Sequence, residues 1–164
     1  MRQLFYLALT LFTFASCSKK QEELKSTSMT RPVKNVSISI NSSKEQVYQF
    51  ASNPENFPRW LAFVKSVSRK SENVWNAETT IGQIEIQFVP ANEFGIIDHL
   101  VKLQDGTEVS NPLRVIGNDK GSEVIFTLFQ MPGKTERDIE EDAGLVEADL
   151  ATLKRILENN RPGL

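Results

Sequence analysis

The segment TERDIEEDAGLVEADLATLKRIL, residues 135–157, decides the fold of this chain. Its apolar residues recur at alternating steps of four and three, so they form one continuous stripe along a helix: Ile139, Ala143, Val146, Leu150, Leu153 and Leu157. Thr135 and Asp138 are placed to open that helix. A coiled coil uses the same spacing, but here the repeat covers only about three heptads and follows a strand-rich segment. We therefore expect the stripe to pack across a sheet.

The strand-rich segment between Phe63 and Met131 supplies that sheet. Ile84, Ile86 and Phe88 alternate with polar residues, which is typical of a half-buried strand. Turn compositions separate the strands at 71–73, 90–92, 105–106 and 118–121. Short connections of this kind predict antiparallel pairing, and a sheet with one apolar face needs a cover, which the C-terminal helix can provide.

The residues before this sheet predict one more strand and two short helices. Residues 33–40 alternate between apolar and polar side chains, as a strand does. Ser42 and Glu45 have the spacing of a capping box, which predicts a helix that begins there and ends at Asn53-Pro54. Residues 54–60 then predict a short helical turn with two bulky aromatic side chains. The whole order indicates an α+β fold.

This order of elements resembles the START-like superfamily, also called SRPBCC, which includes polyketide cyclase/dehydrase-like and pollen-allergen-like proteins. The phrases that carry the resemblance are NPENFPRW at 53–60, EFGIIDH at 93–99, TLFQ at 127–130 and EADLATLKR at 147–155. The resemblance covers residues 33–160. It implies the helix-grip fold, a curved antiparallel sheet wrapped around a long C-terminal helix, with two short helices after the first strand. It also implies a cavity between sheet and helix, in which members bind lipids, sterols, hormones or polyketides; only some members are catalysts.

Residues 1–16 predict a bacterial lipoprotein signal peptide, which ends before Cys17, the only cysteine. Arg2 precedes an apolar run over 4–14, which is shorter than the roughly 20 residues that span a bilayer. The motif Phe14-Ala15-Ser16-Cys17 resembles the lipobox, although leucine is commoner at the position of Phe14. The alternatives are an ordinary signal peptide cut nearby, or an uncleaved anchor, with Cys17 a passive thiol. Lipidation of Cys17 would explain a lone cysteine in an exported protein.

Residues 17–32 are poor in large apolar side chains and rich in Lys, Glu, Ser and Thr, so we expect a flexible, lipid-anchored tether. The START-like domain at 33–160 would then lie in the cell envelope, at the periplasmic or outer surface of a bacterial membrane. The net charge is −2 and the basic residues are scattered, which argues against nucleic acid as a partner. We expect a monomer.

His99 is the only histidine and shares the apolar face of its strand with Ile97, Val101 and Leu103. Three roles stay open for it: a core residue with one hydrogen-bond partner, a polar contact of a ligand, or a catalytic acid or base. Asp98 should face the other way. Asn111 is a second polar residue on an inward face, where it would orient the same ligand or mark a strand irregularity before Pro112.

Four aromatic residues, Trp60, Phe63, Trp75 and Phe88, are candidates for the lining of a pocket or for the core. No phosphate-binding, nucleophilic-serine or zinc-site motif is present, so we expect no cofactor, no metal and no assigned catalytic residue. We interpret the chain as a membrane-tethered domain that binds a small hydrophobic or amphipathic ligand. Two alternatives remain: a cyclase-, dehydratase- or hydrolase-type enzyme that uses His99, and an envelope protein-interaction module with a filled core. The lack of a second titratable inward residue favours the binding protein over the enzyme.

Overall fold

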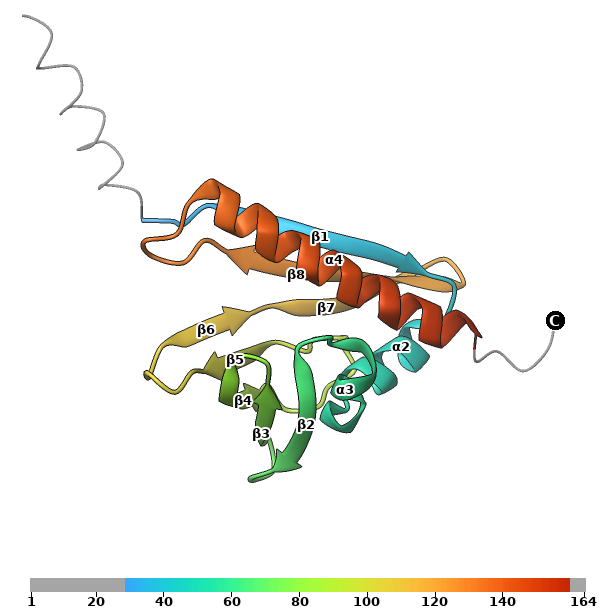
Figure 1. Cartoon of the computed structure of the whole chain (residues 1–164). Helices are drawn as coiled ribbons and strands as arrows, with labels where there is room; N and C mark the ends of the chain where they lie inside the picture. The colour runs from blue at the N-terminus through green and yellow to red at the C-terminus, as the bar shows by residue number, and fades with distance from the viewer. Residues whose placement is uncertain (1–28, 160–164) are drawn as a thin grey trace, which may run out of the picture. The chain divides into compact units, whose positions relative to one another are not determined.

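The computed structural model describes residues 29–159 (Figure 1). The predicted signal peptide, Cys17 and most of the predicted tether lie outside these residues. Among the described residues, no helix has both the length and the apolar character needed to cross a membrane. The elements, in chain order, are β1 (Val33–Ile40), α2 (Lys44–Ala51), η1 (Pro54–Asn56), α3 (Phe57–Trp60), β2 (Val64–Arg69), β3 (Val74–Thr79), β4 (Gly82–Phe88), β5 (His99–Lys102), β6 (Glu108–Asn111), β7 (Leu113–Asn118), β8 (Gly121–Phe129) and α4 (Glu136–Asn159).

The strands form two antiparallel sheets, one of three strands in the order β1-β8-β7 and one of five in the order β2-β3-β4-β5-β6. The residues before β5 join them, because the Ile97 N–H donates to the Leu113 carbonyl and the Val115 N–H donates to the Gly95 carbonyl, both at 2.9 Å. Pro112 separates β6 from β7 and has no N–H to donate, so the strand leaves one sheet there and enters the other. The strand irregularity before Pro112 is therefore present.

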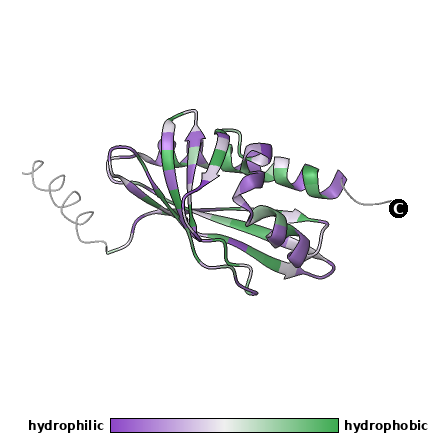
Figure 2. Ribbon diagram, turned by 90° about the horizontal axis from the view of Figure 1, so that it is seen from below, coloured by the Kyte–Doolittle hydropathy of each residue, from purple (hydrophilic) through white to green (hydrophobic). Residues whose placement is uncertain are grey.

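Helix α4 lies across β1 and β8 and also contacts α3 (Figure 1). The predicted apolar stripe faces the strands: Ile139, Ala143, Leu150 and Leu153 are buried, and Val146 and Leu157 are half-buried. Figure 2 shows hydrophobic and hydrophilic residues alternating along α4 and along the strands. The predicted arrangement, an antiparallel sheet structure packed against a long C-terminal helix with short helices after the first strand, is confirmed.

Two residues close the N-terminus of α4 as expected. The Asp138 N–H donates to Thr135 Oγ1 at 3.3 Å, and the Thr135 N–H donates to Asp138 Oδ2 at 2.6 Å, which is the reciprocal pattern of a capping box. The hydrogen bond from the Thr135 backbone N–H, followed by one from the Thr135 hydroxyl at 2.7 Å, lowers the pKa of the Asp138 carboxyl group. A negatively charged carboxylate at this position also stabilises the helix, because it lies at the positive end of the helix dipole.

The cap of α2 lies one residue later than the sequence predicts. Ser43, not Ser42, is the N-cap, and Gln46, not Glu45, completes the capping box. The reason is the end of β1, where the Ser42 N–H donates to the Ile40 carbonyl at 2.8 Å and closes a tight turn. This turn leaves Ser43 with the extended backbone that an N-cap requires, at φ −62° and ψ 154°.

Candidate functional site

Phe88, His99 and Asn111 form a row across three neighbouring strands of the five-stranded sheet. Phe88 pairs with His99 between β4 and β5, and His99 pairs with Asn111 between β5 and β6. The ring centroids of Phe88 and His99 lie 5.2 Å apart with an angle of 39° between the planes. The structure therefore brings together the two polar residues that the sequence singled out, directly across one strand pair, with an aromatic ring beside them.

Phe57 connects this row to α3. Its ring lies 5.7 Å from that of Phe88 and 5.7 Å from that of Trp60, in edge-on geometry in both cases. Trp60 is only 5% exposed, and its indole Nε1 is buried without a hydrogen-bond partner among residues 29–159. Trp60, Phe57, Phe88 and His99 thus form one continuous aromatic chain from α3 to β5, which we call the aromatic wall.

The His99 ring has a defined orientation. Its Nδ1 lies 3.0 Å from the carbonyl oxygen of Ile97, which can only accept, so Nδ1 carries the proton of the neutral imidazole. Burial lowers the pKa of His99, and the hydrogen bond to Ile97 offsets part of that effect. Asp98 does not pair with His99: it accepts from the Leu113 N–H at 3.1 Å and forms an ion pair with Arg114.

The lowered pKa of His99 predicts how the stability of the protein depends on pH. Because the folded protein binds this proton less readily than the unfolded chain, stability should fall as the pH decreases below about 6.5. His99 is the only histidine, so the imidazole C–H signals in a proton NMR titration report it alone. We expect a midpoint below the ordinary value of 6.5. A midpoint above that value would show that the ring is held as a cation, contrary to this account.

A hollow of about 320 Å³ lies beside the aromatic wall. Two of the predicted aromatic residues, Trp75 and Phe88, line it. The other lining residues come from α2, η1 and the loops around β2, β3 and β4: Tyr48, Ser52, Asn53, Pro54, Arg69, Glu72, Asn73, Val89, Ala91, Ile96 and Ile97. Tyr48 was missed because it does not belong to the inward stripe that the sequence suggests for its helix; its hydroxyl accepts from the Asn92 N–H at 2.9 Å. Pro54 and Ile96 lie within NPENFPRW and EFGIIDH, two phrases that indicate the fold and not a site.

The remaining predicted site residue, Phe63, lies elsewhere. It is 36% exposed, and its carbonyl accepts from the Thr80 N–H in the turn between β3 and β4. It contributes to neither the aromatic wall nor the hollow. Lipidation of Cys17 concerns a residue outside the described part of the chain.

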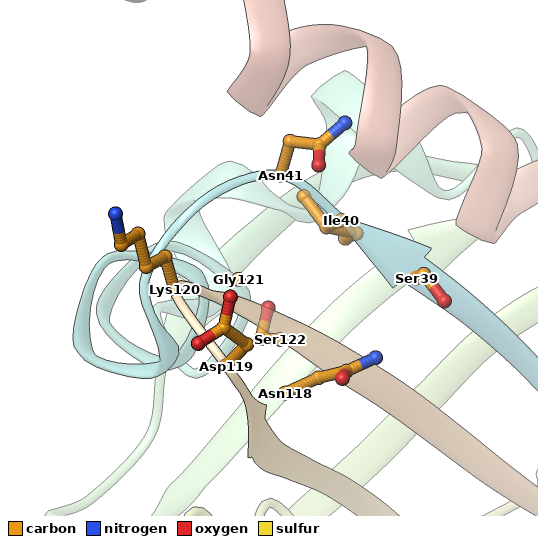
Figure 3. Close-up of a pocket in the computed structure, with 8 residues that line it drawn as sticks. All are labelled: Ser39, Ile40, Asn41, Asn118, Asp119, Lys120, Gly121 and Ser122. Carbon is orange, nitrogen blue, oxygen red and sulfur yellow. The ribbon is translucent and has the colours of Figure 1, made fainter.

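A second hollow, of about 380 Å³, lies where β1 ends beside the turn between β7 and β8 (Figure 3). Its lining is mostly polar: Ser39, Ile40, Asn41, Asn118, Asp119, Lys120, Gly121 and Ser122. No residue of α4 lines either hollow. On the strands and on α4, several apolar side chains are half-buried and pack against the core: Val67, Val101, Leu103, Phe126, Leu128 and Val146. Within residues 29–159, no group of three or more His, Cys, Asp and Glu side chains is placed to hold a metal ion.

Solved structures resemble this chain in fold. A START superfamily protein from Mycobacterium smegmatis matches with a TM-score of 0.60 and 14% identity over 79% of this chain and 99% of its own. The Aha1 dimer from Colwellia psychrerythraea matches with a TM-score of 0.63 and 16% identity over 80% and 99%. An uncharacterized protein from Bacillus thuringiensis matches with a TM-score of 0.64 and 16% identity over 77% and 98%.

The fold is START-like. The chain matches no protein-family model and no curated protein sequence. At identities this low the likeness establishes the START-like fold alone, so a function for this START-like domain has to come from the aromatic wall and the hollow beside it.

Proposed function

We propose that the protein binds a small hydrophobic or amphipathic molecule in the hollow beside the aromatic wall. One observation carries the proposal: Phe88 lines the hollow and also packs against both Phe57 and His99. A molecule in the hollow would therefore rest on aromatic rings that the core holds in place. The volume of about 320 Å³ lies at the lower end of the range for ligand pockets, which favours a compact ligand.

The binding energy would come mainly from removal of apolar surface from water. Burial of about 200 Å² of apolar ligand surface contributes about 5 kcal/mol, before the cost of lost motion is subtracted. Polar groups around the wall would then select the orientation of the ligand, as is usual in pockets that are mostly apolar. His99 and Asn111 are the polar residues that the row provides.

Binding of the neutral probe N-phenyl-1-naphthylamine to the full chain tests this proposal. We expect saturable probe fluorescence, and we expect Phe88→Ala to weaken the affinity at least about tenfold because the central ring of the wall is lost. Phe94→Ala is the matched control, since Phe94 is 67% exposed and does not line the hollow. Thermal melts of both variants separate lost binding from lost folding. If both variants bind the probe as the wild type does, the hollow is not the site.

We also propose that the protein is held to a bacterial membrane, in the cell envelope, by acyl chains on Cys17. The lipobox resemblance and the lone cysteine support this. More than one acyl chain gives durable attachment, where a single chain would be marginal.

Labelling with radioactive palmitate tests the anchor. The wild-type protein should incorporate label and fractionate with the membrane, and Cys17→Ser should do neither, because the sulfur that accepts the lipid is gone. A Cys17→Ser protein that still takes up label and stays with the membrane would disprove the lipobox interpretation. Loss of the anchor should leave binding of N-phenyl-1-naphthylamine unchanged, because the hollow is built entirely from residues 48–97.

A further inference from the structure

We infer that the ligand of this site is an uncharged molecule that presents a hydroxyl group to His99 Nε2, and is not a carboxylate or a phosphate. The inference rests on the proposed function and specifies the chemistry of its ligand. It follows from two polar atoms of the aromatic wall that have no hydrogen-bond partner among residues 29–159, and from the uncharged residues beside His99.

His99 offers an acceptor and not a donor. Because Nδ1 donates to the Ile97 carbonyl, the other ring nitrogen, Nε2, carries a lone pair in the neutral imidazole. Nε2 has no hydrogen-bond partner among residues 29–159, and it does not belong to the atoms of that part of the chain that are both buried and unpartnered. Nε2 is therefore not sealed off by protein, although His99 itself does not line the hollow. Phe88 and Ile97, the two residues that hold the ring, both line the hollow.

Among residues 29–159, the strand partners of His99 carry no charge that would hold an anion. Its neighbours across the two strand pairs are Phe88 and Asn111, which are both uncharged. The carboxylate next to His99 in the chain, that of Asp98, already pairs with Arg114. From α3, the side chain that contacts Phe88 is the uncharged ring of Phe57. An anion placed against the Nε2 lone pair would be desolvated without compensation.

Two further groups need to be considered. Arg69 lines the hollow, but its Nε and Nη2 donate to the carbonyls of Ser71 and Glu72 at 3.1 and 3.3 Å, and the Glu72 residue lines the same hollow. Trp60 Nε1 is a buried donor without a partner among the described residues, and it suits a neutral acceptor oxygen as well as an anion. The acceptor at His99 therefore discriminates between ligand classes, because only a ligand that has a donor can use it.

Three naphthalene derivatives that share one ring system test the inference by displacing N-phenyl-1-naphthylamine from the full chain at neutral pH: 2-naphthalenemethanol, 2-naphthoate and 2-methylnaphthalene. We expect the alcohol to bind at least about tenfold more tightly than the carboxylate, and about several-fold more tightly than the methyl compound, because only the alcohol can donate a hydrogen bond to the unpartnered Nε2. In His99→Phe the alcohol should lose its advantage over the methyl compound, whose own affinity should stay the same. Arg69→Gln should leave the order of the three ligands unchanged.

The outcomes separate the inference from the proposed function. If the methyl compound displaces the probe and the alcohol has no advantage, or if 2-naphthoate binds as tightly as the alcohol, the inference is wrong and the proposed function stands. If the probe itself does not bind, both fail. Should His99→Phe not fold, the ¹⁵N chemical shift of Nε2 in the wild-type protein decides, since the chain has one histidine. It should move on addition of the alcohol and not of the methyl compound; equal responses overturn the inference.

Discussion

Replacement of Leu153 by alanine should lower the free energy of unfolding by about 3 kcal/mol. Leu153 is fully buried, at 0% exposure, in the middle of the stripe that α4 presents to the strands. Truncation to alanine removes apolar contacts and leaves a cavity that a helix fixed at both ends cannot easily close. The N-terminal part of the helix is tied to β1 by Lys34, whose Nζ donates to Glu140 Oε1 at 2.8 Å, and its C-terminal part by Lys154, whose Nζ donates to the Ser39 carbonyl at 2.6 Å.

Urea denaturation of the wild type and the variant measures this loss directly. Leu145→Ala is the matched control, because Leu145 belongs to the same helix but is 69% exposed. The control should change the free energy of unfolding by no more than about 0.5 kcal/mol. Equal losses for the two leucines would mean that α4 does not pack through its predicted stripe.

Replacement of Gly95 by alanine should be at least as damaging, with an expected loss of about 3 kcal/mol or more. Gly95 has a φ of +81°, where side chains other than hydrogen are strained, and a Cβ built there would overlap the Val115 carbonyl oxygen. Neither atom can move easily, since the Val115 N–H donates to the Gly95 carbonyl and this contact joins the two sheets. The substitution therefore strains the junction on which the continuity of the sheets depends.

Two other glycines separate the causes of that loss. Gly106→Ala carries the same backbone strain, at φ +85°, but a Cβ there meets nothing within 4 Å, so we expect a cost of only about 1 kcal/mol. Gly144→Ala lies in the interior of α4, also without neighbours within 4 Å, and should stabilise the protein by about 1 kcal/mol. Thermal or urea unfolding measures these losses. If Gly95→Ala and Gly106→Ala lower the stability equally, the junction tolerates a side chain.

The elements that sequence predicted well are those with a local period. The stripe of α4 and the alternation in β1 and β4 depend on residues a few positions apart, so the buried face follows directly from the pattern. The turn between β3 and β4 was not predicted, because Thr80 and Ile81 are not typical turn residues and the unusual backbone is carried by Gly82, at φ +109°. The N-cap of α2 was misplaced because two adjacent serines both fit the motif, and only the bond to the Ile40 carbonyl decides between them.

The candidate site shows the same division between local and distant information. Alternation placed His99 and Asn111 on inward faces, but their direct pairing depends on the register of β5 and β6, which the turn between Leu103 and Thr107 sets. The hollow could not be predicted, because the residues that line it come from α2, η1 and from strands and loops that are distant from them in the chain. The position of a helix on a sheet depends on contacts between residues far apart in the chain, and no short sequence pattern contains them.

The pairing of β1 with β8 has a consequence for how this chain becomes folded. The first strand lies against the last, from Val33 opposite Phe129 to Ile40 opposite Ser122, and Lys34 bonds to Glu140 across 106 residues of sequence. Contacts between such distant residues carry the largest loop-closure entropy and slow the search for the native state. On a ribosome, β1 would emerge first and wait, unpaired, until β8 has been made. The three-stranded sheet, and the face on which α4 packs, can therefore form only near the end of synthesis.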